Sequence, residues 1–249
     1  MRQPTWLYLE TVDSTNKYLK EHAGELPDFT ACYSLNQTAG AGRRGRDWSS
    51  QRDTMLALSF LLHGTQLQDM QVLPLLCAMA AVKGLGALTG RAFGIKWPND
   101  VVLEGKKICG ILCESRILGE DSFAVCGIGF NLLATEGYYR AENLPHAGSV
   151  FSLTGLRLSP EKVREQYLAE FAALFDKYRL AGSFAPLAEE YRASSVNIGR
   201  QVRVIWEREE AEGLCTGIAP DGTLLVEIDG EERSIRSGEA SVRGLYGYI

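Results

Sequence analysis

Histidine and cysteine are sparse and scattered in this sequence. Its three histidines lie far apart without acidic pairs beside them, which gives little support for a histidine metal site or a catalytic triad. Its six cysteines form no C-x-x-C pair, so they indicate neither a zinc finger nor a disulfide scaffold. We expect reduced thiols that pack as small hydrophobic side chains. The cysteines are Cys32, Cys77, Cys109, Cys113, Cys126 and Cys215.

Long apolar runs and an excess of positive charge are also missing. No stretch approaches the ~20 uninterrupted apolar residues of a membrane span, and the amino terminus lacks the apolar core of a signal peptide. The formal net charge is -5, whereas surfaces that bind nucleic acid are normally strongly basic. We therefore expect a cytoplasmic protein that binds neither a membrane nor nucleic acid.

The chain is long enough for one large core with a small appended module. It has 249 residues, of which 45% are hydrophobic. After Ser194-Ser195 the pattern changes to short strands and turns, with Asp221-Gly222 and Asp229-Gly230 as hairpin turns. About five short strands in roughly fifty residues predict a small β-barrel there. The boundaries that we expect are 1–195 and 196–249.

The densest chemistry lies in the segment Lys96–Ser115, which reads as a β-hairpin. Val101–Leu103 and Ile108–Leu112 are apolar, and Glu104-Gly105 between them suits a tight turn. Gly110 lies inside the second strand, where a glycine usually marks a close approach by a ligand or by another chain segment. Polar side chains cluster at the strand ends, where a sheet commonly binds ligands: Lys96, Asn99, Asp100, Lys106 and Lys107.

A second segment, Gln37–Ser50, combines glycine with arginine. Three glycines and three arginines fall between Gly40 and Arg46, and such backbone N–H groups and guanidinium groups suit a phosphate or a carboxylate. We expect this loop to be mobile without a ligand, because glycine imposes little order and the arginines repel one another.

The same loop matches G-x-G-x-x-G between Gly40 and Gly45, the dinucleotide-binding fingerprint. That fingerprint must open an apolar helix that packs on the sheet. Arg43 and Arg44 fill its x-x positions and polar residues follow, so no such helix face forms. The sequence also has no G-x-x-x-x-G-K-S/T motif, and we reject both nucleotide-binding folds.

Asp13-Ser14 offers an N-cap for a helix that runs to about His22. Ser14 and Thr15 therefore have two interpretations, either capping alone or ligand binding as well. Periodicity predicts further helices at about Leu67–Leu88, from Ser159-Pro160 to Gly182, and around Ala185–Arg192. Further strands are predicted at Ala31–Leu35, Thr54–Leu62, Phe93–Trp97 and Ser122–Phe130.

Five motifs together resemble those of the biotin protein ligases, in the order that this family has them. The resemblance covers essentially the whole chain, from about Leu9 to Arg243. One loop position departs, because Ala41 stands where the family usually has arginine. The motifs are D-S-T-N (Asp13–Asn16), the Gly/Arg loop (Gln37–Trp48), K-W-P-N-D (Lys96–Asp100), K-x-x-G-I-L-x-E (Lys107–Glu114) and G-x-G-x-N (Gly127–Asn131).

The resemblance implies an α+β fold. We expect a mixed-sheet catalytic domain of the class II aminoacyl-tRNA synthetase/biotin ligase type, followed by an SH3-like barrel. Family members that also act as repressors carry a winged-helix domain before D-S-T-N. Only about a dozen residues precede that motif here, so we expect a ligase without DNA binding.

The resemblance also implies the reaction. ATP and biotin, with Mg²⁺, would give biotinyl-AMP, and a lysine of the biotin carboxyl carrier protein of a biotin-dependent carboxylase would take the biotinyl group. The enzyme would be a monomer or a homodimer. Catalysis would rest on charge placement, because the carboxylate and the triphosphate repel each other.

Site residues follow from the matching motif positions. The catalytic residues implied are Lys107, Arg43 and Asp100, with Asp100 also as a magnesium ligand. The biotin-binding residues implied are Ser14, Thr15, Asn16, Gln37, Gly40, Ala41, Gly42, Arg43, Lys107 and Gly110. The residues implied on the ATP or adenylate side are Arg43, Arg46, Trp48, Asn99, Asp100, Lys107 and Asn131.

Two alternatives stay open. A lipoate ligase or octanoyltransferase would share the fold and an equivalent lysine, although the R-R-G-R and K-W-P-N-D motifs favour a biotin ligase. A non-catalytic biotin-binding protein would keep the pocket, but binding the neutral ureido ring alone would not require Lys107 and the arginines together.

Overall fold

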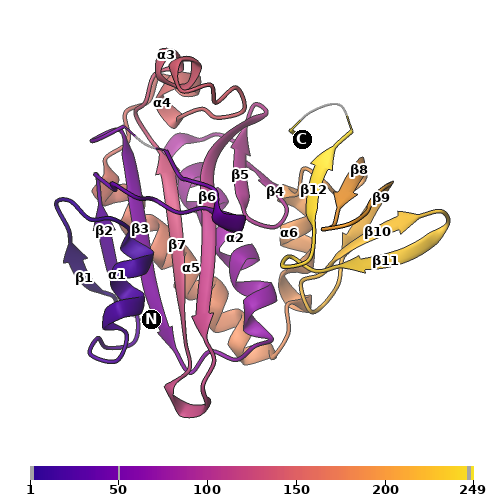
Figure 1. The fold of residues 1–249 in the computed structure, drawn as a ribbon, viewed down its shortest axis with the longest axis horizontal. Coiled ribbons are helices and arrows are strands. Elements are labelled where there is room, and N and C mark those ends of the chain that lie inside the picture. The colour runs from indigo at the N-terminus through magenta and orange to yellow at the C-terminus, as the bar shows by residue number, and fades with distance from the viewer. Residues whose placement is uncertain (1–2, 50, 246–247) are drawn as a thin grey trace.

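A seven-stranded mixed sheet forms the centre of the larger part of the molecule (Figure 1). The computed structural model describes residues 3–49, 51–245 and 248–249, so Ser50 of the Gly/Arg loop lies outside the described residues. The first two strands pair in parallel and all other neighbours pair antiparallel. In spatial order the strands are β1 (Thr5–Tyr8), β2 (Thr30–Ser34), β3 (Met55–His63), β7 (Phe123–Asn131), β6 (Lys106–Arg116), β5 (Asp100–Leu103) and β4 (Gly94–Lys96).

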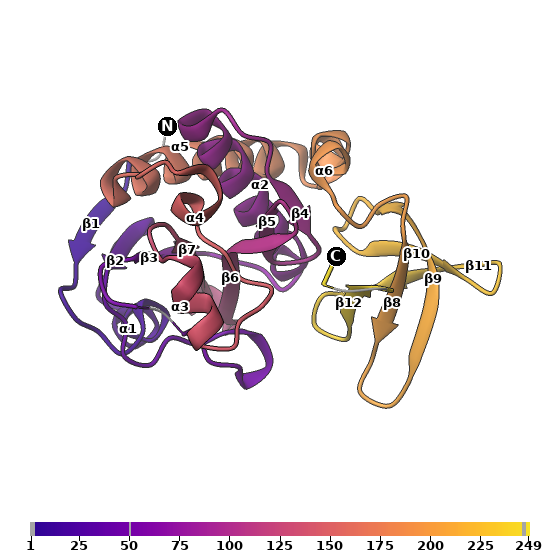
Figure 2. The ribbon, with the colours of Figure 1, turned by 90° about the horizontal axis from the view of Figure 1, so that it is seen from above.

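Helices cover the two faces of this sheet unequally. Figure 2 shows α2 (Asp69–Thr89) and α5 (Pro160–Ala181) on one side and α1 (Thr15–His22) on the other. Side chains alternate accordingly along β3: Phe60 packs on Phe171 of α5, with ring centroids 4.4 Å apart, whereas Ser59 faces α1. The main core therefore lies under α2 and α5, and the opposite face leaves room for a site.

The helix α2 is the most apolar of these elements. Among the described residues it is the one helix whose length and composition would suit a membrane span, but 67% of that window is buried inside the protein. It packs against both the sheet and α5, with Leu73 and Leu76 fully buried. We therefore interpret α2 as a core helix.

The predicted hairpin is confirmed, with β5 and β6 joined at Glu104-Gly105. Both turn residues have positive φ, 49° and 75°, as a type I′ turn requires. The strand β6 runs to Arg116, four residues beyond the predicted end, because it pairs with β7 up to the Arg116–Phe123 partners.

Local capping signals also set the helix ends. The Ser14 hydroxyl accepts a hydrogen bond from the Lys17 N–H, so Ser14 is the N-cap of α1. Ser159 caps α5 in the same way, and Gly182 ends it with φ +68°. These ends lie where the sequence predicts them.

A smaller antiparallel sheet follows α6 (Ala188–Ser194), at the right of Figure 1. Its ladder order is β11-β10-β9-β8-β12. The expectation of an α+β fold with a mixed sheet and a small C-terminal β-module is thus confirmed. The strands are β8 (Gln201–Ile205), β9 (Glu210–Ile218), β10 (Leu224–Ile228), β11 (Glu231–Ile235) and β12 (Ser241–Gly244). The helix predicted around Ala185–Arg192 is a 3-10 turn at Ala185–Leu187 followed by α6. Short elements that were not predicted are α3 (Glu136–Ala141), α4 (Val150–Thr154) and 3-10 turns at Arg43–Gly45 and Gly119–Asp121.

Candidate active site

Two cavities meet on the face of the large sheet that α1 and the Gly/Arg loop cover. The first has an empty volume of about 470 Å³ and the second, which also touches the C-terminal β-module, about 1110 Å³. Both are lined by the same junction residues. These are Gly42, Arg43, Trp48, Asn99 and Lys107.

Neutral groups that already bond to one another line the inner end of the first cavity. The backbone N–H and the hydroxyl of Thr15 both donate to the side-chain oxygen Oε1 of Gln37, at 2.9 and 3.1 Å. The Ser59 hydroxyl lies 2.7 Å from the Thr15 hydroxyl and 2.6 Å from Asn16 Oδ1. The Asn16 amide donates to Glu114 at 2.8 Å. This network holds the cavity wall in one geometry without any ligand.

Glycines on the central strands leave room for the side chains of this wall. A Cβ on Gly127 would lie 1.9 Å from Asn16 Oδ1. On Gly110 it would lie 2.4 Å from the Trp48 ring, and on Gly129 2.6 Å from the same ring. The close approach predicted at Gly110 is therefore made here by another chain segment, the indole of Trp48.

The Gly/Arg loop closes on itself as a narrow hairpin beside the cavity. The Trp48 N–H donates to the Gly40 carbonyl at 2.8 Å, and the Gly42 N–H donates to the Arg46 carbonyl at 2.7 Å. This brings Ala41 and Gly42 into the first cavity. Gly40 lines neither cavity; a Cβ there would lie 2.8 Å from the Trp48 carbonyl oxygen, so its contribution is to the loop turn.

Two arginines fasten this loop to distant segments. The Arg43 guanidinium donates to Asn99 Oδ1 at 3.0 Å and to the Ser237 carbonyl, and Arg44 donates to the Ser241 hydroxyl at 3.0 Å. The last two partners belong to the C-terminal β-module. The loop that we predicted to be mobile thus has partners that its own sequence did not reveal.

Lys107 is held at the junction by a buried carboxylate. Its Nζ lies 2.6 Å from Asp100 Oδ1, and the Tyr248 hydroxyl donates to Asp100 Oδ2. Burial alone would raise the pKa of Asp100, but the ammonium groups of Lys107 and Lys96 and the bonds to Lys107 and Tyr248 outweigh it and lower that pKa. Burial, together with the nearby cations, lowers the pKa of Lys96 to about 8. A strongly ionic cluster therefore sits where the cavities meet.

Sequence reasoning missed Tyr248, which folds back into the second cavity from the C-terminal end. Its ring stacks on His146, with centroids 5.3 Å apart and planes at 14°, and Lys96 Nζ lies 4.5 Å from the ring centroid. No motif marks these contacts, because they depend on where the end of the chain packs.

The structure separates the remaining predicted residues into two groups. Arg46, Trp48, Asn99 and Asp100 line the second cavity, and Trp48 and Asn99 line the first as well. Asn131 lines neither; its buried amide donates to the carbonyls of Lys107 and Gly148 at 3.3 and 3.0 Å. We interpret it as a support for the backbone at Lys107. The other predicted residues in the first cavity are Ser14, Thr15, Asn16, Gln37, Ala41, Gly42, Arg43, Lys107 and Gly110.

Comparison with known proteins shows the family of the chain. Residues 8–131 match the Biotin/lipoate A/B protein ligase family, and residues 198–243 match the Biotin protein ligase C terminal domain. The bifunctional ligase/repressor BirA of Escherichia coli (strain K12) is 31% identical over 238 residues, which cover 94% of this chain and 73% of BirA. A biotin--[acetyl-CoA-carboxylase] ligase of Paracoccus denitrificans is 33% identical over 228 residues, covering 88% of this chain and 92% of that one.

Among solved structures, the biotin protein ligase from Aquifex aeolicus in complex with biotin and ATP superposes with a TM-score of 0.83. It is 30% identical and covers 96% of this chain and 99% of its own. The motifs, the fold and these relatives lead to one conclusion: the chain belongs to the biotin protein ligase family.

Proposed function

We propose that this protein is an ATP-dependent biotin–protein ligase. It joins biotin to AMP and then transfers the biotinyl group to a lysine of a biotin carboxyl carrier protein. One observation carries the proposal: a neutral, hydrogen-bonding cavity and a cationic cavity meet at Lys107 and Arg43. A neutral head group and a triphosphate can thus bind at opposite ends with the reacting carboxylate between them.

The first cavity suits biotin. The ureido ring of biotin offers N–H donors and a carbonyl acceptor, and the cavity presents the hydroxyls of Ser14 and Thr15 with the amides of Asn16 and Gln37.

The second cavity suits the nucleotide. Six cationic and two acidic side chains line it. Such a surplus attracts a polyphosphate, and the guanidinium groups bind phosphate oxygens with two parallel bonds. The cations are Arg43, Arg44, Arg46, Lys96, Lys107 and Arg243.

Lys107 acts where the two substrates react. A carboxylate oxygen of biotin attacks the α-phosphorus of ATP, a P–O bond forms, and pyrophosphate leaves with the electrons of the bond that breaks. The Lys107 ammonium stabilises the charge that develops on these oxygens once it turns from Asp100 to the substrate. In the second step the neutral amine of the carrier lysine attacks the acyl carbon and AMP leaves.

The magnesium role predicted for Asp100 does not fit this arrangement. Both oxygens of its carboxylate are engaged, by Lys107 and by Tyr248, and Lys96 faces it as well. A divalent cation would meet two ammonium groups there. We therefore propose that Mg²⁺ enters as part of the substrate, bound to the phosphates of ATP.

The wider assignments follow from the same site. We propose residues 1–195 as the catalytic domain and residues 196–249 as the C-terminal domain. One chain lines both cavities, which is compatible with a monomer or a homodimer. We also propose a cytoplasmic location, because the substrate ATP is available there and the six free cysteines suit a reducing compartment.

Pyrophosphate release tests the proposal. Protein, Mg·ATP and biotin should release pyrophosphate, and adding a carrier domain should give a product heavier by one biotinyl group in the mass spectrum. Lipoate is the matched competitor, because its dithiolane ring offers no N–H donor to the neutral wall of the first cavity, which Thr15, Asn16, Gln37 and Ser59 form. Release with lipoate but not with biotin would make the protein a lipoate ligase. Biotin binding without any release would make it a non-catalytic binding protein.

A further inference from the structure

The side chain of Tyr248 contacts three polar residues of the second cavity. Its hydroxyl donates a hydrogen bond to Asp100 Oδ2. Its ring centroid lies 4.5 Å from Lys96 Nζ, and the ring stacks on His146 with centroids 5.3 Å apart. The match to the Biotin protein ligase C terminal domain ends at residue 243, and none of the five motifs includes Tyr248. The family resemblance therefore gives this side chain no role.

The Tyr248 hydroxyl acts as a hydrogen-bond donor toward a charged partner. Burial, together with the nearby carboxylate of Asp100, raises the pKa of Tyr248 far above its ordinary value of 10.0, so the phenol keeps its proton. The pKa of Asp100 is lowered, so this carboxylate is ionised. The bond between them is therefore a charge-assisted hydrogen bond, which is stronger than a bond between neutral groups.

Asp100 has few partners that compensate for its burial. Lys107 Nζ lies 2.6 Å from its Oδ1 atom, and the ammonium group of Lys96 adds a favourable charge nearby. Within residues 3–49, 51–245 and 248–249, the Tyr248 hydroxyl is the only other hydrogen-bond donor to this carboxylate. In the proposed reaction Lys107 has to leave Asp100 for the oxygens of the substrates. Tyr248 is then the one donor that remains on Asp100.

The hydrogen bond from Tyr248 should become stronger when Lys107 leaves. While Lys107 is present, its ammonium group compensates much of the charge on Asp100. Once it has left, the buried carboxylate depends on Lys96 and on the Tyr248 hydroxyl, and a bond to an uncompensated charge is worth more. The hydroxyl therefore stabilises the state with Lys107 at the substrates more than the state with Lys107 on Asp100.

We propose that Tyr248 is a positioning residue, which favours the movement of Lys107 from Asp100 to the reacting oxygens. This role rests on the proposed ligase function. Tyr248 acts through Asp100 and not on the substrates themselves, because its hydroxyl stabilises the charge that Lys107 leaves behind.

The ring of Tyr248 has a separate effect. It holds Lys96 by a cation–π contact and packs on His146, whose carbonyl accepts the Lys107 N–H at 2.7 Å. The ring thus supports both the cationic wall of the second cavity and the backbone at Lys107. Phenylalanine keeps these ring contacts and lacks only the hydroxyl, so the two effects can be measured separately.

The variant Tyr248→Phe tests the role of the hydroxyl. The kcat for pyrophosphate release should fall by about five- to tenfold, the difference between an ordinary hydrogen bond and one to a charged group. The KM values for ATP and biotin should stay unchanged, because the ring and both cavity walls remain. A purely structural role would lower the stability and leave the kcat of the folded protein unchanged. An unchanged kcat would therefore overturn the proposal.

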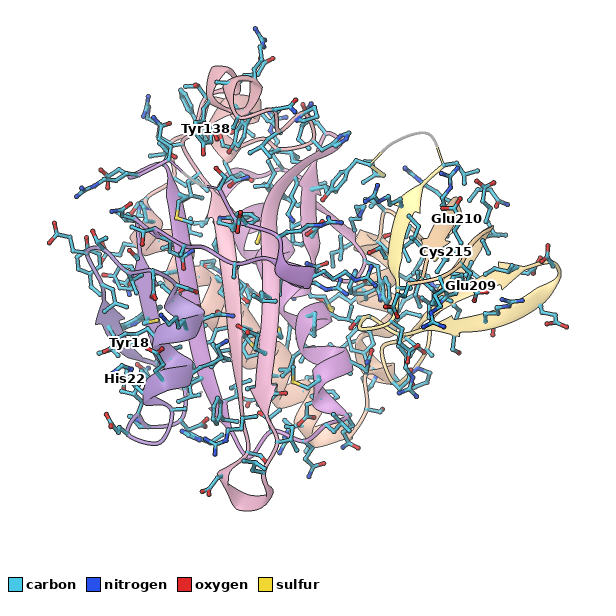
Figure 3. The ribbon with its side chains drawn as sticks, in the orientation of Figure 1. Tyr18, His22, Tyr138, Glu209, Glu210 and Cys215 are labelled. Carbon is cyan, nitrogen blue, oxygen red and sulfur yellow. The ribbon has the colours of Figure 1, made fainter. Side chains whose placement is uncertain are left out.

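Tyr18→Phe is the matched control. Tyr18 also stacks on a histidine, His22, with ring centroids 4.4 Å apart, and the two residues lie together on α1 (Figure 3). Tyr18 lines neither cavity, so the loss of its hydroxyl should leave kcat unchanged. An equal fall of kcat in both variants would overturn the specific role of Tyr248. The natural protein is measured beside them, and no pyrophosphate release from it would refute the ligase function itself.

A double-mutant cycle tests whether Tyr248 acts through Asp100. Asp100→Asn removes the charge that holds Lys107, so Tyr248→Phe should cause little further loss of kcat in that background. Single-turnover assays with excess enzyme measure these low rates. Independent effects, which multiply in the double variant, would overturn the proposal. Circular dichroism checks folding, and if Asp100→Asn does not fold, the single Tyr248→Phe variant still decides.

Tyr248→Leu shows whether the ring helps or hinders the nucleotide. Leucine removes the hydroxyl and the aromatic face together, so kcat should fall as in Tyr248→Phe. The KM for ATP should also rise, because Lys96 loses its cation–π partner. A lower KM for ATP in this variant would mean that Tyr248 obstructs the second cavity, and it would overturn a supporting role.

Discussion

The two cavities that meet at Lys107 differ in what keeps each of them in shape. In the first, Arg43 and Lys107 are the only charged side chains among the described lining residues, and the polar groups of its inner end bond to one another. In the second, six cations surround two carboxylates. One wall is satisfied without a ligand, and the other is left with surplus charge.

The two cavities therefore contribute differently to binding: the first determines which ligand is accepted, and the second supplies electrostatic attraction. A satisfied neutral wall gains from a ligand only if that ligand replaces each hydrogen bond that it breaks, so it selects by shape and by donor pattern. The cationic wall of the second cavity gains from any well-placed anion, because binding relieves the repulsion among its ammonium and guanidinium groups. Biotin recognition should therefore depend on the first cavity, and adenylate formation on the second.

Removing the Lys107 side chain should have the largest effect, because Lys107 lines both cavities where they meet. Lys107→Ala takes away an ammonium that lines both cavities, so adenylate formation should slow by about 10²–10³-fold, the cost of losing one preorganised donor. Pyrophosphate release under saturating biotin and ATP measures it. Lys106→Ala is the control on the same strand, because the Lys106 ammonium is bound to the Pro145 carbonyl at 2.6 Å and is exposed. Similar rates for both variants would contradict the role of Lys107.

A larger side chain at position 127 should disturb only the hydrogen-bonded wall of the first cavity. The new methyl group of Gly127→Ala would lie 1.9 Å from Asn16 Oδ1, so Asn16 must leave Ser59 and Glu114. Biotin affinity should fall by roughly five- to 150-fold, since overpacking costs about 1–3 kcal/mol, while ATP affinity stays unchanged. Calorimetry measures both affinities. Gly24→Ala, where a Cβ meets nothing within 4 Å, should change neither.

Raising the pH should weaken the cationic wall alone. Lys96 has a pKa of about 8 in the free protein, so above that pH its side chain is neutral. ATP binding is then coupled to the uptake of one proton by Lys96 from solvent. The dissociation constant for ATP should then rise by up to about tenfold per pH unit, while biotin affinity stays level. Lys96→Arg, whose charge persists in this range, should flatten the profile. A steep profile in that variant would assign the titration to another group.

Lys96 should also make the free energy of unfolding rise with pH. Unfolded Lys96 keeps its proton up to its ordinary pKa of 10.5, whereas folded Lys96 loses it near 8. The unfolded state thus binds more protons between these values, and the free energy of unfolding gains a contribution that rises with pH. Denaturant titrations at pH 7.5 and pH 9.5 should show this rise in the natural protein and a smaller one in Lys96→Gln.

Features that depend on neighbouring residues could be predicted from the sequence. The Glu104-Gly105 turn, the Ser14 cap and the Gly182 helix end each rest on the backbone preferences of one or two residues. The residues of the first cavity could be predicted as a group because their motifs are short and follow one another in a fixed order. Gly110 was recognised as a point of close approach, but what approaches it, Trp48, is set by the loop conformation.

Features that depend on packing could not be predicted. Tyr248 reaches Asp100 across 148 positions of the chain, and Arg43 reaches Ser237 across 194. Periodicity and spacing carry no information about such pairs. The cysteines Cys77, Cys113 and Cys126 are the same case, because a scattered set in the sequence becomes a cluster in space.

The smallest effect concerns the loop that separates the cavities from solvent. Arg43 lines both cavities and bonds to Asn99 and Ser237, whereas Arg44 lines only the second and bonds to Ser241. Arg43→Gly removes the bonds that hold the loop over the junction and adds backbone freedom. Arg44→Gly is the matched control, because Arg44 has φ +58°, which glycine adopts without strain.

Biotinyl-AMP is a reactive mixed anhydride, so an enzyme that opens too early releases it to acylate any exposed lysine. A typical hydrogen bond contributes about 0.5–1.5 kcal/mol, and its loss in Arg43→Gly should speed release by about two- to tenfold. Incubating each variant with biotin, ATP and serum albumin, then measuring biotin on the albumin, gives the result. We expect labelled albumin with Arg43→Gly and little with Arg44→Gly. The contrary outcome is an Arg43→Gly protein that still makes the adenylate but leaves the albumin unlabelled. It would mean that Arg43 does not retain the intermediate.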